Sequence, residues 1–262
     1  MKICIVMPAY NEEERIGRTL EAYCSFFLQK KSKEGLEFEI LVVINNTKDN
    51  TEGIVKNFQK KCKELKYLNF KKGGKGFAII QGFKDALKRK NDLIGFVDAD
   101  LATPAFAFYE LIKNINNYGG IIASRYMKGS IVRPKQTLKR IIASRVFNFI
   151  VRSLFLLPYR DTQLGAKLFK RKAVESIINK LGTTMWAFDI DLLYHLKRKG
   201  FKIKEIPSTW QDVDGSKLNV EKASIQMFFA IIRLRILNSP LKIFWQVLRP
   251  ISGWIWRFLQ KY

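Results

Sequence analysis

The stretch "GFVDADLATP", residues 95–104, closes an apolar run with two aspartates that are two positions apart. Side chains along a β-strand alternate between the faces of the sheet, so Asp98 and Asp100 are predicted to leave one face together where the strand ends. Two carboxylates at close range repel each other, and a bridging cation removes that repulsion. The stretch therefore predicts a strand of a sheet with a cation site at its end.

Segments of two kinds alternate on both sides of this stretch. Short apolar runs predict strands at 2–10, 38–46, 66–70, 93–100 and 119–126, and amphipathic runs predict helices at 11–30, 47–65, 77–90 and 104–115. This alternation predicts an α/β fold with a mostly parallel, Rossmann-like central sheet and helices on both faces. Ligands of such sheets gather at the carboxyl ends of the strands, which is where "PAYNE", "INNT" and "DAD" fall.

The second half of the chain contains long apolar stretches that cations interrupt. Residues 138–157 and 241–259 combine Phe, Leu and Ile with scattered Lys and Arg, and neither holds the ~18 uncharged residues that a membrane span needs. Amphipathic helices of this composition bind at a membrane surface. We therefore predict one domain at 1–220, a C-terminal amphipathic extension at 221–262, and peripheral attachment to an anionic membrane surface.

Composition indicates the class of partner. Among 262 residues, 47 Lys and Arg against 23 Asp and Glu give a net charge of +24, which predicts nucleic acid, lipid headgroups or a phosphorylated substrate as the anionic partner. A nucleic-acid-binding protein stays open as the non-enzyme alternative, but the cations are dispersed and no nucleic-acid-binding motif occurs, so we predict no nucleic acid among the partners. The three cysteines fit reduced thiols in the cytosol, and the single histidine gives little support to a histidine metal site or a Ser-His-Asp triad.

Seven blocks of the sequence together match one known pattern. They are "VMPAYNEEERI", "INNTKDNT", "GGKGFAIIQGF", "VDADLATP", "SRYMKGS", "DTQLGAKLF" and "FDIDLL", and they occur in the family's order. On these blocks the chain resembles the inverting family-2 glycosyltransferases of GT-A fold, and most closely the branch of dolichyl-phosphate glucosyltransferases and dolichol-phosphate mannose synthases. The resemblance implies a metal-dependent enzyme that moves a hexose from a nucleotide sugar to dolichyl or polyprenyl phosphate.

The resemblance also implies which carboxylates act. Asp100 would ligate Mg²⁺ or Mn²⁺, and Asp98 would face the ribose or assist at the metal. A divalent cation neutralises the charge of a departing diphosphate. Of the acidic pair Asp189 and Asp191, Asp191 would serve as the catalytic base or would orient the acceptor. Because a lipid phosphate is already anionic, positioning and charge neutralisation can replace a base.

The resemblance implies the donor site residue by residue. Its members are Pro8, Tyr10, Glu12, Asn45, Lys75, Asp98 and Lys217, of which the first three surround the nucleoside and the two lysines approach the diphosphate. Asn45 stands where many relatives carry an aspartate directed at the base, and this departure leaves the base open. Ala102 stands where mannose synthases tend to carry a glutamine, so UDP-glucose is predicted over GDP-mannose.

The resemblance assigns the acceptor phosphate to three residues. They are Arg125 in "SRYMKGS" and the pair Arg140 and Ser144, which are four positions apart and therefore share one helix face. Two other enzymes stay open, namely a GDP-mannose-dependent dolichol-phosphate mannose synthase and a related glycosyltransferase with a glycan acceptor. The predicted location is the cytoplasmic face of a membrane.

Overall fold

The computed structural model describes residues 1–134, 137–182, 187–211 and 220–239, with the backbone alone at residues 139, 140 and 220–225. The chain divides into two compact units. Residues 1–136 and 159–214 form the first unit, and residues 137–158 and 215–262 form the second. The predicted domain boundary near residue 220 stays a prediction.

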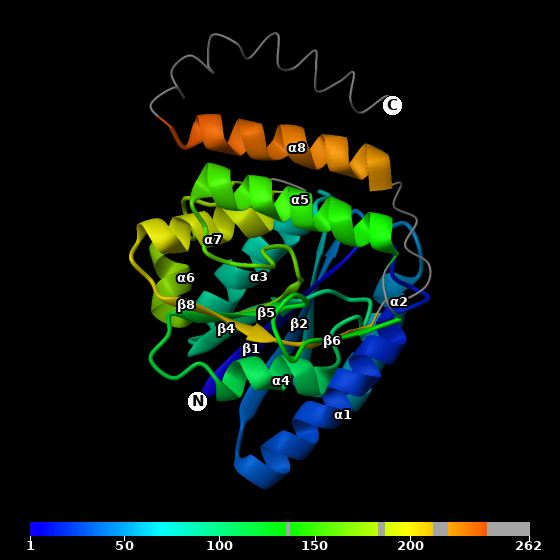
Figure 1. The fold of residues 1–262 in the computed structure, drawn as a ribbon. Coiled ribbons are helices and arrows are strands. Elements are labelled where there is room, and N and C mark those ends of the chain that lie inside the picture. Colours follow the sequence, from blue (N-terminus) through cyan, green and yellow to red (C-terminus); the bar gives the residue numbers. More distant parts are fainter. Residues whose placement is uncertain (135–136, 183–186, 212–219, 240–262) are drawn as a thin grey trace. The chain divides into compact units, whose positions relative to one another are not determined.

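A seven-stranded sheet forms the centre of the first unit (Figure 1). Its strands are β1 (Lys2–Ala9), β2 (Glu37–Asn45), β3 (Leu65–Phe70), β4 (Leu93–Val97), β5 (Gly120–Ser124), β7 (Ala166–Lys170) and β8 (Ile203–Pro207). Their order across the sheet is β3-β2-β1-β4-β7-β5-β8. Strand β7 is antiparallel to both of its neighbours, and the other pairs are parallel. The predicted α/β fold with a mostly parallel sheet is confirmed.

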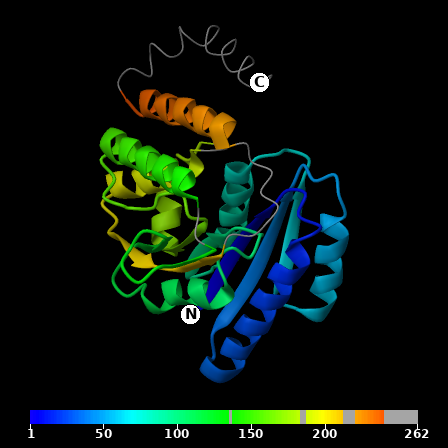
Figure 2. The same cartoon turned by 45° about the vertical axis from the view of Figure 1, so that its right-hand side comes forward.

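Helices cover both faces of this sheet, as predicted (Figures 1 and 2). One face carries α1 (Ile16–Glu34), α2 (Thr51–Lys61) and α4 (Ala105–Lys113), and the other carries α3 (Lys75–Lys88), α6 (Arg171–Ile177) and α7 (Phe188–Arg198). Strand alternation explains the double coverage, because Ile3 and Ile5 join the core that includes α1 residues whereas Val6 packs against Gly82 of α3. Both faces of β1 are therefore buried.

Strand β4 ends one residue before Asp98, whereas the predicted strand extended to Asp100. Asp98 still donates its backbone N–H to the Gly165 carbonyl at 3.0 Å. The chain then turns, because Leu101 takes a left-handed φ of 62° and an Asp100 carboxylate oxygen accepts the Ala102 N–H at 3.0 Å. The turn, rather than strand alternation, therefore sets the position of Asp100.

A second, two-stranded sheet pairs β6 (Ile131–Arg133) with β9 (Thr209–Gln211) in parallel. The Gln211 N–H donates to the Ala102 carbonyl at 2.8 Å, which ties this small sheet to the turn after β4. The sequence also predicts an extended segment at 201–213, and its described part, 201–211, contains β8 and β9. Strand β6 and helix α6 have no counterpart among the sequence predictions.

The described part of the second unit consists of α5 (Leu138–Phe155) and α8 (Val220–Leu237), which lie side by side (Figures 1 and 2). Helix α5 occupies the first of the two predicted amphipathic stretches. In the ranges that the structure describes, no helix combines the length and the apolar character that crossing a bilayer requires. The second predicted stretch, 241–259, lies outside the described residues.

Gly95 in the middle of β4 generates a stability prediction. A Cβ at this position would lie 2.5 Å from the Lys167 carbonyl oxygen of β7 and 2.9 Å from the Phe108 ring. Because the backbone cannot move aside as a side-chain tip can, Gly95→Ala is expected to lower the free energy of unfolding by about 1–3 kcal/mol. Urea unfolding measures this loss.

Gly17 in α1 provides the matched control for that measurement. A Cβ there would meet its nearest neighbour at 3.7 Å, an ordinary contact. Alanine is favoured over glycine inside a helix by about 1 kcal/mol, so Gly17→Ala should raise the free energy of unfolding. A Gly95→Ala variant that is as stable as Gly17→Ala would contradict the packing argument.

Candidate functional site

Hydrogen bonds tie together the two loops that follow β1 and β2. The Asn11 side-chain oxygen accepts the Lys48 N–H at 2.9 Å. The Glu12 N–H in turn donates to the Thr51 hydroxyl at 2.8 Å. These bonds hold "PAYNE" against the segment after "INN", and they explain why α1 begins at Ile16 rather than at the predicted residue 11. The two loops therefore form one ordered rim at the carboxyl edge of the sheet.

Asp98 and Asp100 lie at this same edge, immediately after β4. The Asp98 side chain is 36% exposed, and its Oδ1 lies 2.5 Å from the Lys75 ammonium nitrogen. Asp100 shapes the turn through its bond from the Ala102 N–H. The structure thus brings together Asp98, Asp100 and Lys75, three of the residues that the sequence assigned to the site.

Gly165 has no side chain, and the Asp98 carboxylate occupies the space where one would lie. A Cβ at Gly165 would overlap that carboxylate, with Oδ2 as the nearest atom. The Gly165 carbonyl also accepts the Asp98 N–H. Asp98 is therefore held by Lys75 at one carboxylate oxygen and by the Gly165 carbonyl at its backbone N–H. The other carboxylate oxygen fills the space where a side chain at position 165 would lie, which explains the glycine in "DTQLGAKLF".

Lys75 opens helix α3 directly after two glycines. Burial lowers the pKa of Lys75, but the charges of Asp98 and Asp189 outweigh burial, so its pKa is raised. The ammonium therefore stays charged at neutral pH. It is placed to interact with a carboxylate or with an anionic ligand at the sheet edge.

Lys167 on β7 is fully buried, and sequence reasoning missed it as a site residue. Its ammonium donates to the Asp189 carboxylate at 2.5 Å and to the Leu164 carbonyl at 2.6 Å. It also lies 5.3 Å from the centre of the Phe96 ring, and Lys75 lies 6.0 Å from the same ring. A buried lysine requires such partners, so a lysine inside the apolar strand "AKLFK" was the available signal.

Asp191, the predicted base, makes its contacts within the protein. Its Oδ2 accepts the Gly182 N–H at 2.8 Å, and its Oδ1 lies 3.2 Å from Nε2 of His195. Asp189, by contrast, contacts Lys167 and acts electrostatically on Lys75. The structure therefore brings Asp189 toward the Asp98 cluster, and the role of Asp191 stays a prediction.

Arg125, predicted to bind acceptor phosphate, forms a two-pronged ion pair with Asp161. The Nε atom lies 2.7 Å from one Asp161 oxygen and Nη2 lies 2.9 Å from the other. Burial lowers the pKa of Arg125, but Asp161 outweighs burial and raises it overall. Burial likewise raises the pKa of Asp161, and Arg125 reverses that shift so that the pKa is lowered. A phosphate at Arg125 would have to share the guanidinium with this carboxylate.

Asn45 is buried and uses both ends of its amide. Its Nδ2 donates to the Ala9 carbonyl at 2.9 Å, and its Oδ1 accepts the Gly74 N–H at 2.9 Å. A carboxylate cannot donate, so these two bonds give a structural reason for asparagine at this position. The amide joins the end of β1, next to the half-buried Pro8, to the loop that carries Lys75. Contact of Asn45 with a nucleotide base stays a prediction.

Tyr10 and Glu12 both lie on the rim, but Tyr10 is exposed whereas Glu12 is partly buried in an ion pair. The Tyr10 side chain is exposed, which leaves an aromatic face open to a ligand. Glu12 pairs with Arg15, whose Nε lies 2.8 Å from its carboxylate. Burial raises the pKa of Glu12 to about 7; Arg15 opposes this shift, and the charges of Asp100 and Asp98 add to it. Three carboxylates therefore lie within electrostatic reach of one another.

Three predicted site residues lie elsewhere in the chain. Lys217 is outside the described residues. Arg140, described by its backbone alone, and Ser144 belong to α5 of the second unit. The assignment of donor diphosphate to Lys217 and of acceptor phosphate to Arg140 and Ser144 stays a prediction.

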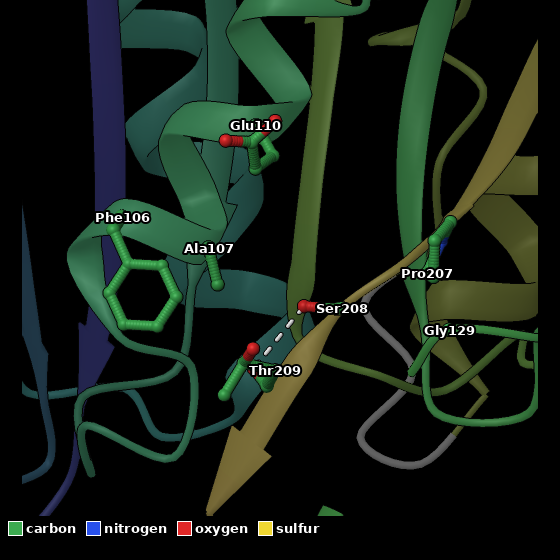
Figure 3. Close-up of a pocket in the computed structure, with 7 residues that line it drawn as sticks. All are labelled: Phe106, Ala107, Glu110, Gly129, Pro207, Ser208 and Thr209. Atoms are coloured by element: carbon green, nitrogen blue, oxygen red, sulfur yellow. Dashed lines mark hydrogen bonds between the residues drawn. The ribbon is translucent and has the colours of Figure 1, made fainter. Parts of the chain in front are cut away.

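Two hollows occur on the described surface of the first unit. The smaller, about 90 Å³, is bordered by Phe106 and Ala107 on α4 and by Ser208 and Thr209 at the start of β9 (Figure 3). This volume is well below the ~300–1,000 Å³ of typical ligand pockets. The larger, about 500 Å³, lies at the C-terminal end of α7 and is lined by Lys180, His195, Arg198 and Lys199. Neither of these two hollows is lined by Asp98 or Asp100.

The paired carboxylates have the chemistry of a divalent cation site. Mg²⁺ and Mn²⁺ prefer oxygen ligands and are commonly held by one or two carboxylates together with substrate phosphates. Asp98 and Asp100 supply two such carboxylates at one turn. In the described part of the chain, no group of three or more His, Cys, Asp and Glu side chains could hold a metal ion. The residues present fit a cation that completes its coordination with ligand oxygens.

Comparison with known proteins identifies relatives of this chain. Residues 4–178 match the family model described as Glycosyl transferase family 2. A dolichyl-phosphate beta-glucosyltransferase from Dictyostelium discoideum is 32% identical, with 89% of this chain and 73% of the relative covered. A protein of the same name from Saccharomyces cerevisiae is 31% identical, with 89% and 74% covered. The resemblance found in the sequence is confirmed.

Solved structures show the same fold. Glucosyl-3-phosphoglycerate synthase from Mycobacterium tuberculosis, crystallised with Mn²⁺, UDP-glucose and phosphoglyceric acid, aligns with a TM-score of 0.64 over 89% of this chain and 79% of its own. The two sequences are 15% identical, so this likeness shows the fold alone. The predicted GT-A fold is confirmed.

The raised pKa of Glu12 generates a pH prediction. With a pKa of about 7 in the folded chain and an ordinary value of 4.5, this carboxyl group binds more protons in the folded state than in the unfolded state between these two values. Its contribution to stability is therefore complete below the ordinary value and is lost as the pH rises through the folded value. Glu12→Gln, which cannot ionise, is expected to lose less stability than the unchanged chain between about pH 5 and about pH 8.

Urea unfolding at the two pH values measures this difference. Glu14→Gln is the matched control, because Glu14 is exposed two positions further along the same loop. The control should keep the pH dependence of the unchanged chain. If Glu12→Gln and Glu14→Gln lose equal amounts of unfolding free energy between the two pH values, the assignment of this pH dependence to Glu12 is contradicted.

Proposed function

Because the chain belongs to glycosyl transferase family 2, we propose that this glycosyltransferase moves glucose from UDP-glucose onto dolichyl or a related polyprenyl phosphate. Two relatives named dolichyl-phosphate beta-glucosyltransferase support the acceptor and the sugar. The fold neighbour that binds UDP-glucose and Mn²⁺ supports the donor and the metal. The observation that carries the proposal is the pair Asp98 and Asp100 beside Lys75 at the carboxyl edge of the sheet.

The reaction is proposed as a single displacement at the anomeric carbon of glucose. A lipid phosphate oxygen forms a bond to that carbon while the bond to the β-phosphate oxygen of UDP breaks, so an α-linked donor gives a β-linked product. Mg²⁺ or Mn²⁺, when bound by Asp98 and Asp100, supplies charge neutralisation to the departing diphosphate. Lys75 adds a fixed positive charge at the same edge. The exposed ring of Tyr10 offers a face on which uracil can stack.

The acceptor phosphate is anionic at neutral pH, so the attack needs positioning more than a base. A carboxylate near the sugar is still useful, since it can accept hydrogen bonds from the sugar hydroxyls. Asp189 is the better-placed member of the acidic pair, because Lys167 fixes its carboxylate and Lys75 lies within reach of its charge. We assign the orientation of glucose to Asp189.

The polyprenyl chain of the acceptor requires access to a bilayer, and α5 has the surface for it. Leu138, Ile142, Val146 and Phe149 are exposed at helical spacing and form an apolar stripe on this helix. The exposed cations Arg145 and Arg152 lie on the same helix and suit anionic headgroups. We propose peripheral attachment to an anionic membrane surface through this stripe. Three free cysteines in the first unit support the cytoplasmic face.

Labelled sugar nucleotides test the reaction directly. The chain is incubated with polyprenyl phosphate, Mg²⁺ or Mn²⁺, and UDP-glucose or GDP-mannose, and the lipid is then extracted. Label from UDP-glucose in the lipid supports the proposal. Label from GDP-mannose alone would assign the chain to mannosyl transfer. If neither donor labels the lipid, polyprenyl phosphate is rejected as the acceptor.

Asp100→Asn is expected to reduce glucosyl transfer by about a hundredfold or more, because it removes a carboxylate from the proposed cation site. The melting temperature should change little, since asparagine can still accept the Ala102 N–H. Asp92→Asn is the matched control: Asp92 lies at the other end of β4, where it accepts the Lys2 N–H. Full transfer by Asp100→Asn would reject the cation assignment.

The α5 stripe predicts binding to liposomes that contain anionic lipid. The double variant Ile142→Glu with Phe149→Glu is expected to sediment with them less than the unchanged chain, because two charges would enter the apolar contact. Ala143→Glu with Asn57→Glu is the control, since Ala143 is exposed on α5 outside the stripe, Asn57 is exposed on α2, and the charge change is the same. Equal loss in both double variants would show that net charge, and not the stripe, drives binding.

A further inference from the structure

Asp98 already has a cationic partner within the chain. The Lys75 ammonium lies 2.5 Å from Oδ1, and both side chains are about one-third exposed, at 34% and 36%. Oδ2 faces the Gly165 backbone, which leaves no space for a Cβ. Lys75 therefore engages one oxygen of this carboxylate, and the other oxygen packs beside Gly165.

A divalent cation that binds Asp98 must compete with that ammonium. Two positive charges at one carboxylate oxygen repel each other at a range of a few ångströms, and partial burial strengthens the repulsion relative to water. Metal binding at Asp98 and Asp100 therefore becomes easier once Lys75 has moved away. The structure makes Lys75 a competitor of the metal as well as a candidate ligand of the donor.

Lys75 has two features that allow this movement without loss of its charge. Its ammonium lies at the end of a long side chain, which can move while the backbone before it stays fixed by the bond from the Gly74 N–H to Asn45 at 2.9 Å. The charge of Asp189 also acts on Lys75 and favours its ammonium form. A diphosphate at the sheet edge offers oxygens that can replace Asp98 as the partner of Lys75.

We propose that Lys75 is an exchangeable counter-cation that holds Asp98 until a divalent cation arrives with a nucleoside diphosphate, and that it then pairs with the diphosphate. This inference rests on the proposed function and deepens it, because it makes metal binding depend on the donor. Removal of the Lys75 ammonium should therefore strengthen binding of the divalent cation and weaken binding of the nucleoside diphosphate. A simple phosphate-binding lysine would affect the nucleotide alone.

Lys75→Met tests the exchange, since methionine has a similar length and no charge. Mn²⁺ alone should bind this variant roughly tenfold more tightly than the unchanged chain, because a charge-assisted competitor is gone. UDP should bind its Mn²⁺ form roughly tenfold more weakly, because an ammonium partner of the diphosphate is lost. Since coupling between two ligands is reciprocal, UDP should then strengthen Mn²⁺ binding less than it does in the unchanged chain.

The measurement is the free Mn²⁺ signal in electron paramagnetic resonance, followed as protein is added with and without UDP. Lys71→Met is the matched control, because Lys71 is exposed in the same loop and its loss changes net charge equally. Lys75→Arg keeps the charge and should keep Mn²⁺ binding weak. Tighter Mn²⁺ binding confined to Lys75→Met, together with weaker UDP binding, supports the exchange.

Three outcomes overturn the inference. If Lys71→Met and Lys75→Met strengthen Mn²⁺ binding equally, the change in net charge explains the effect and competition by Lys75 does not. Unchanged or weaker Mn²⁺ binding in Lys75→Met would remove the competition, and unchanged UDP binding would remove the transfer of Lys75 to the diphosphate. If the unchanged chain binds no UDP at any Mn²⁺ concentration, the proposed donor fails before the variants are compared, and the inference fails with it.

Discussion

Charge pairing at the carboxyl edge of the sheet is the constraint on which the site depends. Carboxylates that are wholly or partly removed from water are costly unless cations meet them closely. Among the described residues, three pairs that meet this requirement join different parts of the fold, namely Lys75 with Asp98, Lys167 with Asp189, and Arg125 with Asp161. The partners come from different elements, so the pairs form only when β4, β5, β7, α3 and α7 are in their final order. The polar edge and the apolar core therefore depend on the same arrangement.

Sequence periodicity predicted the strands that are buried on both faces of the sheet. The apolar runs of β1, β2, β4 and β5 are readable because parallel strands are buried on both sides. A lysine within the apolar run of β7 indicates burial, but the run does not show which carboxylate pairs with Lys167, because Asp189 lies on a different element. The Arg125 contact was also out of reach, since no local pattern connects it to Asp161.

Two aspartates that are two positions apart are placed differently in a turn and in a helix. Asp189 and Asp191 are two positions apart on α7, where each residue rotates the side chain by about 100°, so their carboxylates point to different surroundings. Their separate partners, Lys167 and His195, agree with this rotation. Asp98 and Asp100 instead share a turn in which Leu101 adopts a left-handed conformation that costs a leucine about 1 kcal/mol. A turn of this kind is set by its tertiary surroundings and could not be predicted from alternation.

The antiparallel strand β7 also has a consequence for the order of folding. Strands β1 to β4 pair with one another from the first 97 residues, whereas β5 joins them only through β7, which begins at residue 166. A chain emerging from the ribosome therefore carries β4 as an unpaired edge, and β5 without its final neighbour, until β7 has been made. Exposed apolar edges are templates for pairing with other chains. The strand that supplies Lys167 is thus also the strand that covers the exposed edge of β4.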